Sequence, residues 1–204
     1  MLQHMPLAPL PFNGRYLYIV LFVSAFILWI APEIIASRLK TARDSSNPHD
    51  RNSLTLIAVL WFTGIALSFT FALCLTGAAI PWHRTTFFLV GIFLMLAGVC
   101  FRWNSARLLG AYFTFDVAIQ HGQTLVEAGP YRYVRHPSYT GALVTLVGFG
   151  LALGNWASVV VGTSCLGLAY IYRIRVEEAA LVSVFGESYR QYQKRTWRLF
   201  PFLL

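Results

Sequence analysis

Long apolar segments alternate with short polar connections along most of the chain. A transmembrane helix needs roughly 20 mostly apolar residues, and five segments of the chain come close to that length. They lie at residues 16–35, 54–75, 87–101, 141–153 and 157–172. The pattern therefore predicts an all-α, polytopic membrane protein with about five transmembrane helices, all in a single membrane domain that spans residues 1–204.

The last two apolar segments are predicted to pair as a helical hairpin over residues 137–172. Each helix would have 17 residues and a length of about 25 Å, and a Gly-Asn-Trp turn connects them. An antiparallel hairpin returns the Glu177-Glu178 pair to the membrane face that carries Arg135 and His136. Arg102, just past the third apolar segment, is expected on the same face, so three polar clusters should meet at one membrane interface.

Composition and charge agree with a membrane protein. Hydrophobic residues make up 57% of the chain and charged residues only 12%. Of the 16 lysines and arginines, 14 fall on one predicted side of the membrane, and only Arg15 and Arg84 fall on the other. The positive-inside rule therefore predicts a cytosolic C-terminus. Anionic lipid headgroups explain the net charge of +8, so nucleic acid is not an expected partner.

The segment 129–141, with the sequence GPYRYVRHPSYTG, places cations and tyrosines directly before an apolar helix. Two interpretations remain open. In the first, Arg132 and Arg135 only set the topology, the tyrosines are interfacial aromatics, and Pro137 simply suits the first helical turn. In the second, the helix start presents free backbone N–H groups to a bound anion, and Arg135 adds a planar fork for a carboxylate.

The Glu177-Glu178 pair, which follows the last apolar segment, also allows two interpretations. Arg173 stands four residues before Glu177 and Arg175 three before Glu178, so each could form an ion pair along one helix. Acidic groups this close to an apolar span are costly without a partner and are functional by default. Because adjacent side chains on a helix point about 100° apart, one carboxylate can pair with arginine while the other faces a site.

The residues after this pair predict an interfacial helix. Leu181, Phe185, Tyr189 and Tyr192 form an apolar stripe at helical spacing, interrupted by Gly186, with basic residues on the other faces. Such a pattern is typical of an amphipathic helix that lies on the membrane surface. The three cysteines match no metal-ligand spacing, so no metal site is predicted.

Three sequence elements carry a family resemblance. They are Gln123-Thr124-Leu125-Val126, the Arg-His-Pro-x-Tyr core of segment 129–141, and the Glu177-Glu178 pair with the later segment 185–192, FGESYRQY. Over about residues 101–202 the chain resembles the isoprenylcysteine carboxyl methyltransferase family. The Arg-His-Pro-x-Tyr element with the later Glu-Glu pair is specific to a wider group of membrane methyltransferases, which includes phospholipid N-methyltransferases.

The resemblance implies a multi-span enzyme that uses S-adenosylmethionine without a Rossmann domain. Residues 1–100 supply the first three helices, and residues 101–204 form the catalytic half with a cytosolic cofactor-binding cap. The lipid part of the substrate enters sideways between helices. The adenosine pocket is expected to involve Leu125, Val126, Gly129 and Tyr131. The methionine moiety is expected to contact Arg135, His136, Tyr139, Glu177 and Glu178. Gln123 also belongs to the expected cofactor site; it stands where the family often has histidine, and His121 lies two residues earlier.

The expected catalytic residues are Arg102 and Glu178. The resemblance places Arg102 at the position of a family arginine near the substrate carboxylate. Methyl transfer to a carboxylate needs no general base, because the nucleophile is already ionised at neutral pH. The resemblance therefore implies carboxyl O-methylation of a prenylcysteine-like acceptor, and this chemistry agrees with the residue set. The expected partners are a lipid or prenylated small-molecule or peptide substrate, together with membrane lipids.

Alternatives of other reaction classes remain open at this point. A phospholipid N-methyltransferase would transfer the methyl group to an amine, which needs a base such as Glu178 or His136. A membrane reductase of the sterol type can share a polar tail after apolar helices. A non-enzymatic scaffold is a weaker explanation, because it gives no reason for three polar clusters to meet.

Overall fold

The computed structural model describes residues 10–41, 51–113 and 124–201, except for the side chains of residues 37–41, 51, 52 and 111. The described helices are α1 (Tyr16–Thr41), α2 (Arg51–Cys74), α3 (Arg84–Leu109), α4 (Pro137–Ala152), α5 (Trp156–Phe185) and α6 (Glu187–Arg195), with short 3-10 turns between some of them. Four of these helices, α1, α2, α3 and α5, are long and apolar enough to cross a membrane, and α4 is an apolar helix of 16 residues. The predicted all-α membrane architecture is confirmed.

Three helices run further than the apolar pattern predicted, and the first of them, α1, continues to Thr41 instead of residue 35. α3 continues to Leu109 instead of ending near residue 101, because no glycine or proline follows residue 101 until Gly110, which ends the helix with a φ of 56°. α5 likewise continues to Phe185 instead of residue 172, and Gly186 ends it with a φ of 55°. As a result, Arg102 lies inside α3 rather than just past it, and the Glu177-Glu178 pair lies inside α5.

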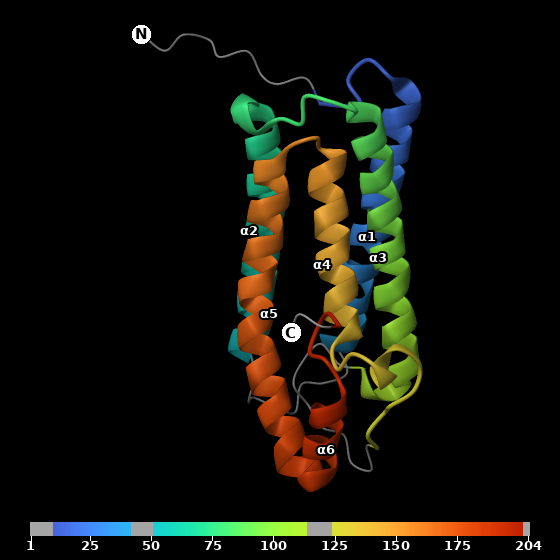
Figure 1. Ribbon diagram of the computed structural model, residues 1–204, viewed down its shortest axis with the longest axis vertical. Coiled ribbons are helices and arrows are strands. Elements are labelled where there is room, and N and C mark those ends of the chain that lie inside the picture. Colours follow the sequence, from blue (N-terminus) through green and yellow to red (C-terminus); the bar gives the residue numbers. More distant parts are fainter. Residues whose placement is uncertain (1–9, 42–50, 114–123, 202–204) are drawn as a thin grey trace.

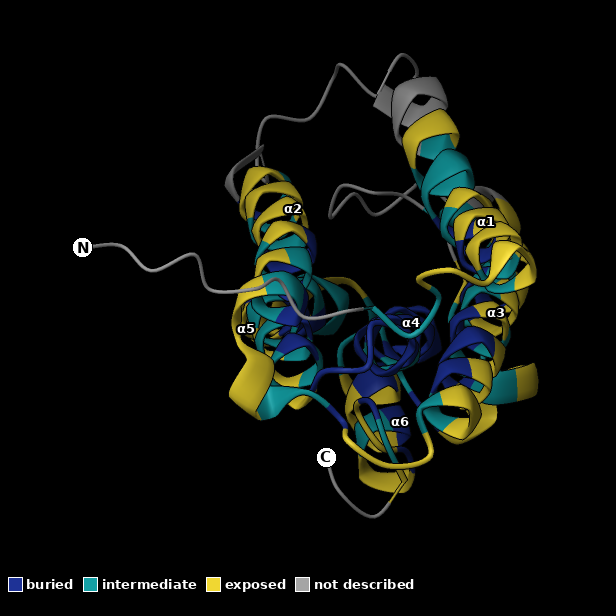
Figure 2. Ribbon diagram, turned by 90° about the horizontal axis from the view of Figure 1, so that it is seen from above, coloured by how far each residue is buried: buried dark blue, intermediate teal, exposed yellow. Residues whose placement is uncertain are grey.

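The helix α4 occupies the centre of the molecule. α3 and α5 pack on either side of it, α1 lies beside α3, and α2 lies beside α5 (Figure 1). Seen from above, α4 is the most continuously buried helix (Figure 2). A helix that is apolar all round is expected to be buried in this way. Its central position brings Pro137, the first residue of α4, into the interior at one end of the bundle.

An aromatic core closes the space between α1, α2 and α4. Phe149 of α4 is fully buried, and its ring centroid lies 6.0 Å from that of Phe22, 5.5 Å from Trp29 and 5.1 Å from Phe69. Trp29 also meets Trp61 of α2 edge-on, at 5.7 Å. Aromatic pairs at these separations stabilise the fold beyond their buried area. The core therefore holds α1 and α2 to the central helix.

Glycines let α3 and α4 approach each other closely. A Cβ atom on Gly141 would lie 2.7 Å from the backbone nitrogen of Arg102 and 2.7 Å from the carbonyl oxygen of Gly98. Gly91 and Gly148 form a similar contact further along the two helices. Small residues at such contacts are the usual means by which membrane helices pack. The contact at Gly141 fixes Arg102 against the start of α4.

We expect Gly141→Ala to destabilise the protein by about 1–3 kcal/mol, because the added methyl group collides with backbone atoms that cannot move aside. The measurement is thermal unfolding in detergent. Gly167→Ala, in α5, is the matched control, since a Cβ there meets no atom within 4 Å. That variant should be neutral or slightly stabilised, because alanine favours helix more than glycine does. Equal effects of the two substitutions would contradict this account of the α3–α4 contact.

Candidate functional site

The C-terminal segment (residues 187–201) folds back onto the loop that precedes α4 (residues 124–136, the motif loop) at one end of the bundle, below α4 in Figure 1. The backbone nitrogen of Arg135 donates to the carbonyl oxygen of Trp197 at 2.7 Å, and the nitrogen of Trp197 donates to the carbonyl oxygen of Tyr133 at 2.9 Å. The nitrogen of His136 donates to the carbonyl oxygen of Arg198 at 3.0 Å. These bonds join residues 133–136 to 197–198 as a short parallel bridge, so the motif loop and the C-terminal segment form one unit.

A buried ionic cluster fixes this unit to α5. Nε of Arg135 donates to Oε1 of Glu178 at 2.8 Å, and Nε of Arg198 donates to Oε2 at 3.2 Å. Nη1 of Arg135 donates to the carbonyl oxygens of Gln193, at 3.0 Å, and of Thr196. The Arg135 fork that we expected to hold a ligand carboxylate therefore holds Glu178 and the C-terminal backbone. The ion partners of Glu178 are Arg135 and Arg198 rather than Arg175 of its own helix.

Glu177 has a different environment from its neighbour. Its side chain is 30% exposed, against 7% for Glu178, and it lines a cavity that Glu178 does not reach. Oε2 of Glu177 accepts a hydrogen bond from the Tyr139 hydroxyl at 2.7 Å and lies 3.8 Å from Nδ1 of His136. The two carboxylates thus point in different directions, as expected for adjacent residues of a helix, and Glu177 is the one that faces the cavity.

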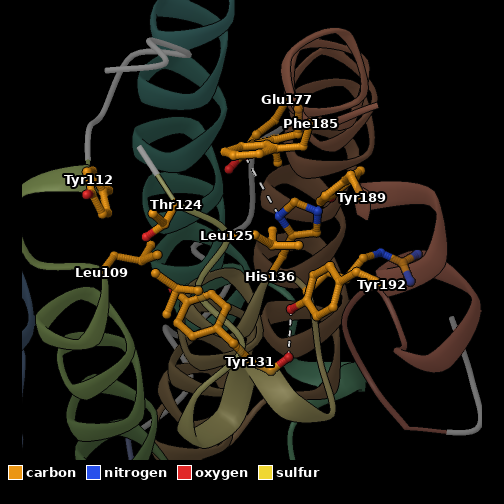
Figure 3. A pocket seen from close by; sticks show the side chains of 13 residues that line it. Leu109, Tyr112, Thr124, Leu125, Tyr131, His136, Glu177, Phe185, Tyr189 and Tyr192 are labelled. Carbon is orange, nitrogen blue, oxygen red and sulfur yellow. Dashed lines mark hydrogen bonds and ion pairs between the residues drawn. The ribbon is translucent and has the colours of Figure 1, made fainter. Parts of the chain in front are cut away.

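The cavity lies between the end of α3, the motif loop, α5 and α6 (Figure 3). Its wall combines one carboxylate with many aromatic rings, and its lining residues are Leu109, Tyr112, Thr124, Leu125, Val126, Tyr131, Arg135, His136, Glu177, Leu181, Phe185, Tyr189 and Tyr192. Burial, followed by the charge of Glu177, raises the pKa of Tyr131 well above its ordinary value. Burial and the charges of Glu178 and Glu177 raise the pKa of Tyr189 in the same way. Both phenols therefore stay neutral at physiological pH.

Two polar atoms in this wall have no hydrogen-bond partner among the described residues. They are Nε2 of His136 and the hydroxyl oxygen of Tyr189, and both residues are at least nine-tenths buried. Oε1 of Glu178 lies 3.5 Å from the histidine nitrogen but outside hydrogen-bonding geometry. A buried polar group without a partner costs roughly 1–3 kcal/mol. Its presence on a cavity wall points to a polar ligand that supplies the missing bond.

Six of the expected cofactor residues line the cavity: Leu125, Val126, Tyr131, Arg135, His136 and Glu177. Three others, Gly129, Tyr139 and Glu178, do not line it. Tyr139 contacts the cavity-lining residue Glu177, and Glu178 contacts the cavity-lining residue Arg135. Gln123 and His121 lie outside the described residues. Within the described parts of the chain, no group of three or more His, Cys, Asp or Glu residues could hold a metal ion.

The apolar stripe of the C-terminal segment faces inward. Leu181, Phe185, Tyr189 and Tyr192 all line the cavity, and the last two are only 1% and 3% exposed. We expected this stripe to face the membrane surface. Helical spacing cannot distinguish the two cases, because an amphipathic helix presents the same pattern to lipid and to a protein cavity. The turn at Gly186 is what directs α6 back over the cavity.

Arg102 lies behind the cavity wall and is paired with a residue that sequence reasoning missed. Its Nε and Nη2 donate to the two carboxylate oxygens of Glu33 in α1, the Nη2 bond being 2.8 Å long. Its Nη1 donates to the hydroxyl of Ser138 at 2.8 Å. Glu33 could have been noticed, because an acidic residue inside a predicted membrane span is a functional candidate by default. Its partner could not be predicted without the packing of α1 on α3.

Comparison with known proteins places the chain in a family. A family model described as phospholipid methyltransferase matches residues 86–188. The protein-S-isoprenylcysteine O-methyltransferase of Schizosaccharomyces pombe is 39% identical over 101 residues, which are 43% of this chain and 43% of the relative. A probable protein-S-isoprenylcysteine O-methyltransferase of Oryza sativa subsp. indica is 30% identical over 162 residues, which are 76% of this chain and 85% of the relative. The chain thus spans less than half of the yeast relative but most of the rice relative.

A solved structure has the same fold. It is that of a eukaryotic intramembrane Ras methyltransferase, an isoprenylcysteine carboxyl methyltransferase, and it matches with a TM-score of 0.61 and 24% sequence identity over 96% of this chain and 69% of that one. Together with the apolar helices, this likeness identifies an integral, multi-pass membrane protein. On the matched sequences and the shared fold, the chain belongs to the isoprenylcysteine carboxyl methyltransferase family of membrane methyltransferases.

Proposed function

We propose that this protein uses S-adenosylmethionine to methylate the carboxylate of a prenylcysteine-like acceptor at the membrane surface. The observation that supports the donor site most strongly is the cavity wall. It contains the Glu177 carboxylate and two polar atoms that have no hydrogen-bond partner among the described residues, Nε2 of His136 and the Tyr189 hydroxyl. These three groups can all accept hydrogen bonds. Glu177 is the one carboxylate among the lining residues, and the cation Arg135, which also lines the cavity, is already paired with Glu178. Such a set of acceptors suits an ammonium group, which carries three donors and no acceptor.

The aromatic side chains of the cavity suit the rest of the donor. Tyr131, Phe185 and Tyr192 present ring surfaces to the cavity, and aromatic faces attract both flat heterocycles and cationic groups such as a sulfonium. Leu125 and Val126 add an apolar edge. When bound there, S-adenosylmethionine would supply an electrophilic methyl group. Glu177 would hold its ammonium group, and the aromatic and apolar side chains would enclose its rings and exclude water.

Glu178 and Tyr139 support the donor site without touching it. Glu178 holds Arg135, and Arg135 in turn holds the C-terminal segment that carries the tyrosines of the wall. Tyr139 donates to Glu177 and thereby orients its carboxylate. We assign Glu178 to positioning rather than to catalysis, because both of its oxygens already accept hydrogen bonds from arginines.

The acceptor is proposed from the relatives and from Arg102. The matched proteins are named as isoprenylcysteine O-methyltransferases, and the guanidinium of Arg102, which donates hydrogen bonds and accepts none, suits a carboxylate rather than an ammonium acceptor. The donor cavity is proposed to face the cytosol, since 14 of the 16 lysines and arginines fall on that side of the predicted topology. Phospholipid N-methylation is the second candidate, because the matching family model carries that description.

The test of this function is a choice between acceptors. Purified protein in lipid nanodiscs is given methyl-labelled S-adenosylmethionine with either an S-prenylcysteine acid or phosphatidylethanolamine. We expect label in the prenylcysteine ester and none above background in the phospholipid. Label in phosphatidylethanolamine alone would replace the proposal by the second candidate.

Tyr189→Phe should weaken binding of S-adenosylhomocysteine by about three- to tenfold, because it removes one neutral hydrogen bond to the ligand. The same substitution should not lower the thermal stability of the unliganded protein, since the hydroxyl has no partner to lose. Tyr192→Phe is the matched control. Its hydroxyl donates to the carbonyl oxygen of Tyr131 at 2.6 Å, so its loss should reduce stability. Calorimetric titration and thermal unfolding measure the two effects, and a Tyr189→Phe variant with unchanged affinity would remove this residue from the site.

A further inference from the structure

A buried ion pair joins the first helix to the arginine assigned to the acceptor. Nε and Nη2 of Arg102 donate to both carboxylate oxygens of Glu33, and the two side chains are 11% and 13% exposed. Glu33 lies in α1, outside the residues 86–188 that carry the family match. The first helix therefore supplies a charged group to a site that otherwise belongs to the second half of the chain.

The pair leaves Arg102 with little free hydrogen-bonding capacity. A guanidinium has five N–H groups. Four hydrogen bonds engage them: two to Glu33, one to the Ser138 hydroxyl at 2.8 Å and one to the Ser138 carbonyl oxygen at 3.3 Å. One N–H group, on Nη2, remains without a partner among the residues that the structure describes. The charge of Arg102 is likewise balanced by that of Glu33.

The pair lies close to the donor cavity, nearer the middle of the bundle. Ser105, one turn beyond Arg102 on α3, accepts a hydrogen bond from the Tyr131 hydroxyl at 3.3 Å, and Tyr131 lines the cavity. Ser138 precedes Tyr139, whose hydroxyl donates to Glu177. An acceptor carboxylate that reaches Arg102 from the membrane interior would therefore meet Glu33 beside the cavity.

We propose that Glu33 neutralises the charge of Arg102 and occupies two of its N–H donors. The acceptor carboxylate then receives one N–H hydrogen bond and meets no net positive charge. This inference rests on the proposed function, because it assumes a carboxylate acceptor. A carboxylate held by both edges of an uncompensated guanidinium is strongly bound and correspondingly less nucleophilic. A single contact orients the same carboxylate and leaves an oxygen reactive. Glu33 is thus a positioning residue that weakens acceptor binding in favour of reaction.

The experiment compares the binding of an S-prenylcysteine acid with that of its methyl ester. The ester has the same lipid and the same contacts but no negative charge, so the ratio of the two affinities reports the charge beside the acceptor carboxyl group. Glu33→Gln removes the negative charge and one acceptor while keeping the shape. We expect the affinity ratio of acid to ester to rise about tenfold, while the affinities for the ester and for S-adenosylhomocysteine stay within about twofold. In turnover, the KM for the acid and kcat should both fall.

Glu187→Gln is the matched control, because Glu187 belongs to an exposed ion pair with Arg190, 61% and 62% exposed. It should leave the ratio unchanged. Ser138→Ala is a second variant that frees one of the two N–H groups of Nη1 and keeps the Glu33 pair, and it should raise the ratio about threefold. This variant tests the idea even where Glu33→Gln fails to fold.

An unchanged affinity ratio in a folded Glu33→Gln or Ser138→Ala protein would overturn the inference. Equal losses of affinity for acid and ester would also overturn it, because they indicate a purely structural pair. Failure of the proposed function is a different result. In that case the wild-type protein itself would bind neither the acid nor S-adenosylhomocysteine.

Discussion

Glu178→Ala should destabilise the protein by about 3–5 kcal/mol, the usual cost of removing one partner from a buried ion pair. Glu178 is 6% exposed, and its loss leaves Arg135 buried without a counter-charge. Because Arg135 also holds the carbonyl oxygens of Gln193 and Thr196, the damage should spread to the C-terminal segment. Thermal unfolding in detergent measures the loss, and limited proteolysis should cut the segment 187–201 first.

The adjacent carboxylate gives the control for this prediction. Glu177 is more exposed and receives its one hydrogen bond, among those described, from Tyr139. Glu177→Ala should therefore cost much less stability than Glu178→Ala, although the two changes are chemically identical. Equal destabilisation by the two substitutions would contradict the different roles that we give to these residues.

Glu177→Gln should weaken binding of S-adenosylhomocysteine by about 10- to 100-fold. The reason is that a hydrogen bond to a charged group contributes roughly 1.5–3 kcal/mol, and Glu177 is the one carboxylate in the cavity wall. The expected fold should remain intact, because glutamine keeps an oxygen for the Tyr139 hydroxyl. Isothermal titration calorimetry on the purified protein is the measurement.

Two further variants test whether the loss of affinity arises from a direct contact between Glu177 and the ligand. Glu187→Gln removes an exposed carboxylate of the same segment and should bind S-adenosylhomocysteine like the wild type. Arg102→Ala should also bind it nearly normally, because Arg102 does not line the cavity, but should lose turnover. A Glu177→Gln variant with wild-type affinity would show that the ammonium of the ligand lies elsewhere.

Local sequence signals were sufficient to predict the helices, and the family motifs picked out six of the residues that line the cavity. The apolar runs gave the five apolar helices, and Pro137 marked the start of α4 as expected. The ends of α3 and α5 were wrong because hydropathy was used to end them. Their physical ends are Gly110 and Gly186, which adopt positive φ values. A helix continues past the membrane as long as no residue breaks it.

Long-range pairs could not be predicted from the chain alone. The Glu33–Arg102 pair spans 69 residues, and it forms only because glycines bring α3 against α4 and because α1 packs on α3. The inward direction of Tyr189 and Tyr192 depends on the turn at Gly186, which the stripe itself does not reveal. The positions of charged residues in the sequence indicated which side chains to consider for the site. Helix packing determines which of these side chains pair with one another.

The most direct test of carboxyl methylation is the pH dependence of the chemical step. Single-turnover transfer from saturating labelled S-adenosylmethionine to an S-prenylcysteine acid is followed between about pH 6.5 and 8.5. A carboxylate acceptor has a reference pKa near 3.5, so it is ionised throughout this range and no obligatory proton transfer occurs. The rate should therefore vary only weakly with pH. A rate that rises about tenfold per pH unit would mean that the reacting group must first lose a proton, and would contradict the assignment of this protein as a carboxyl methyltransferase.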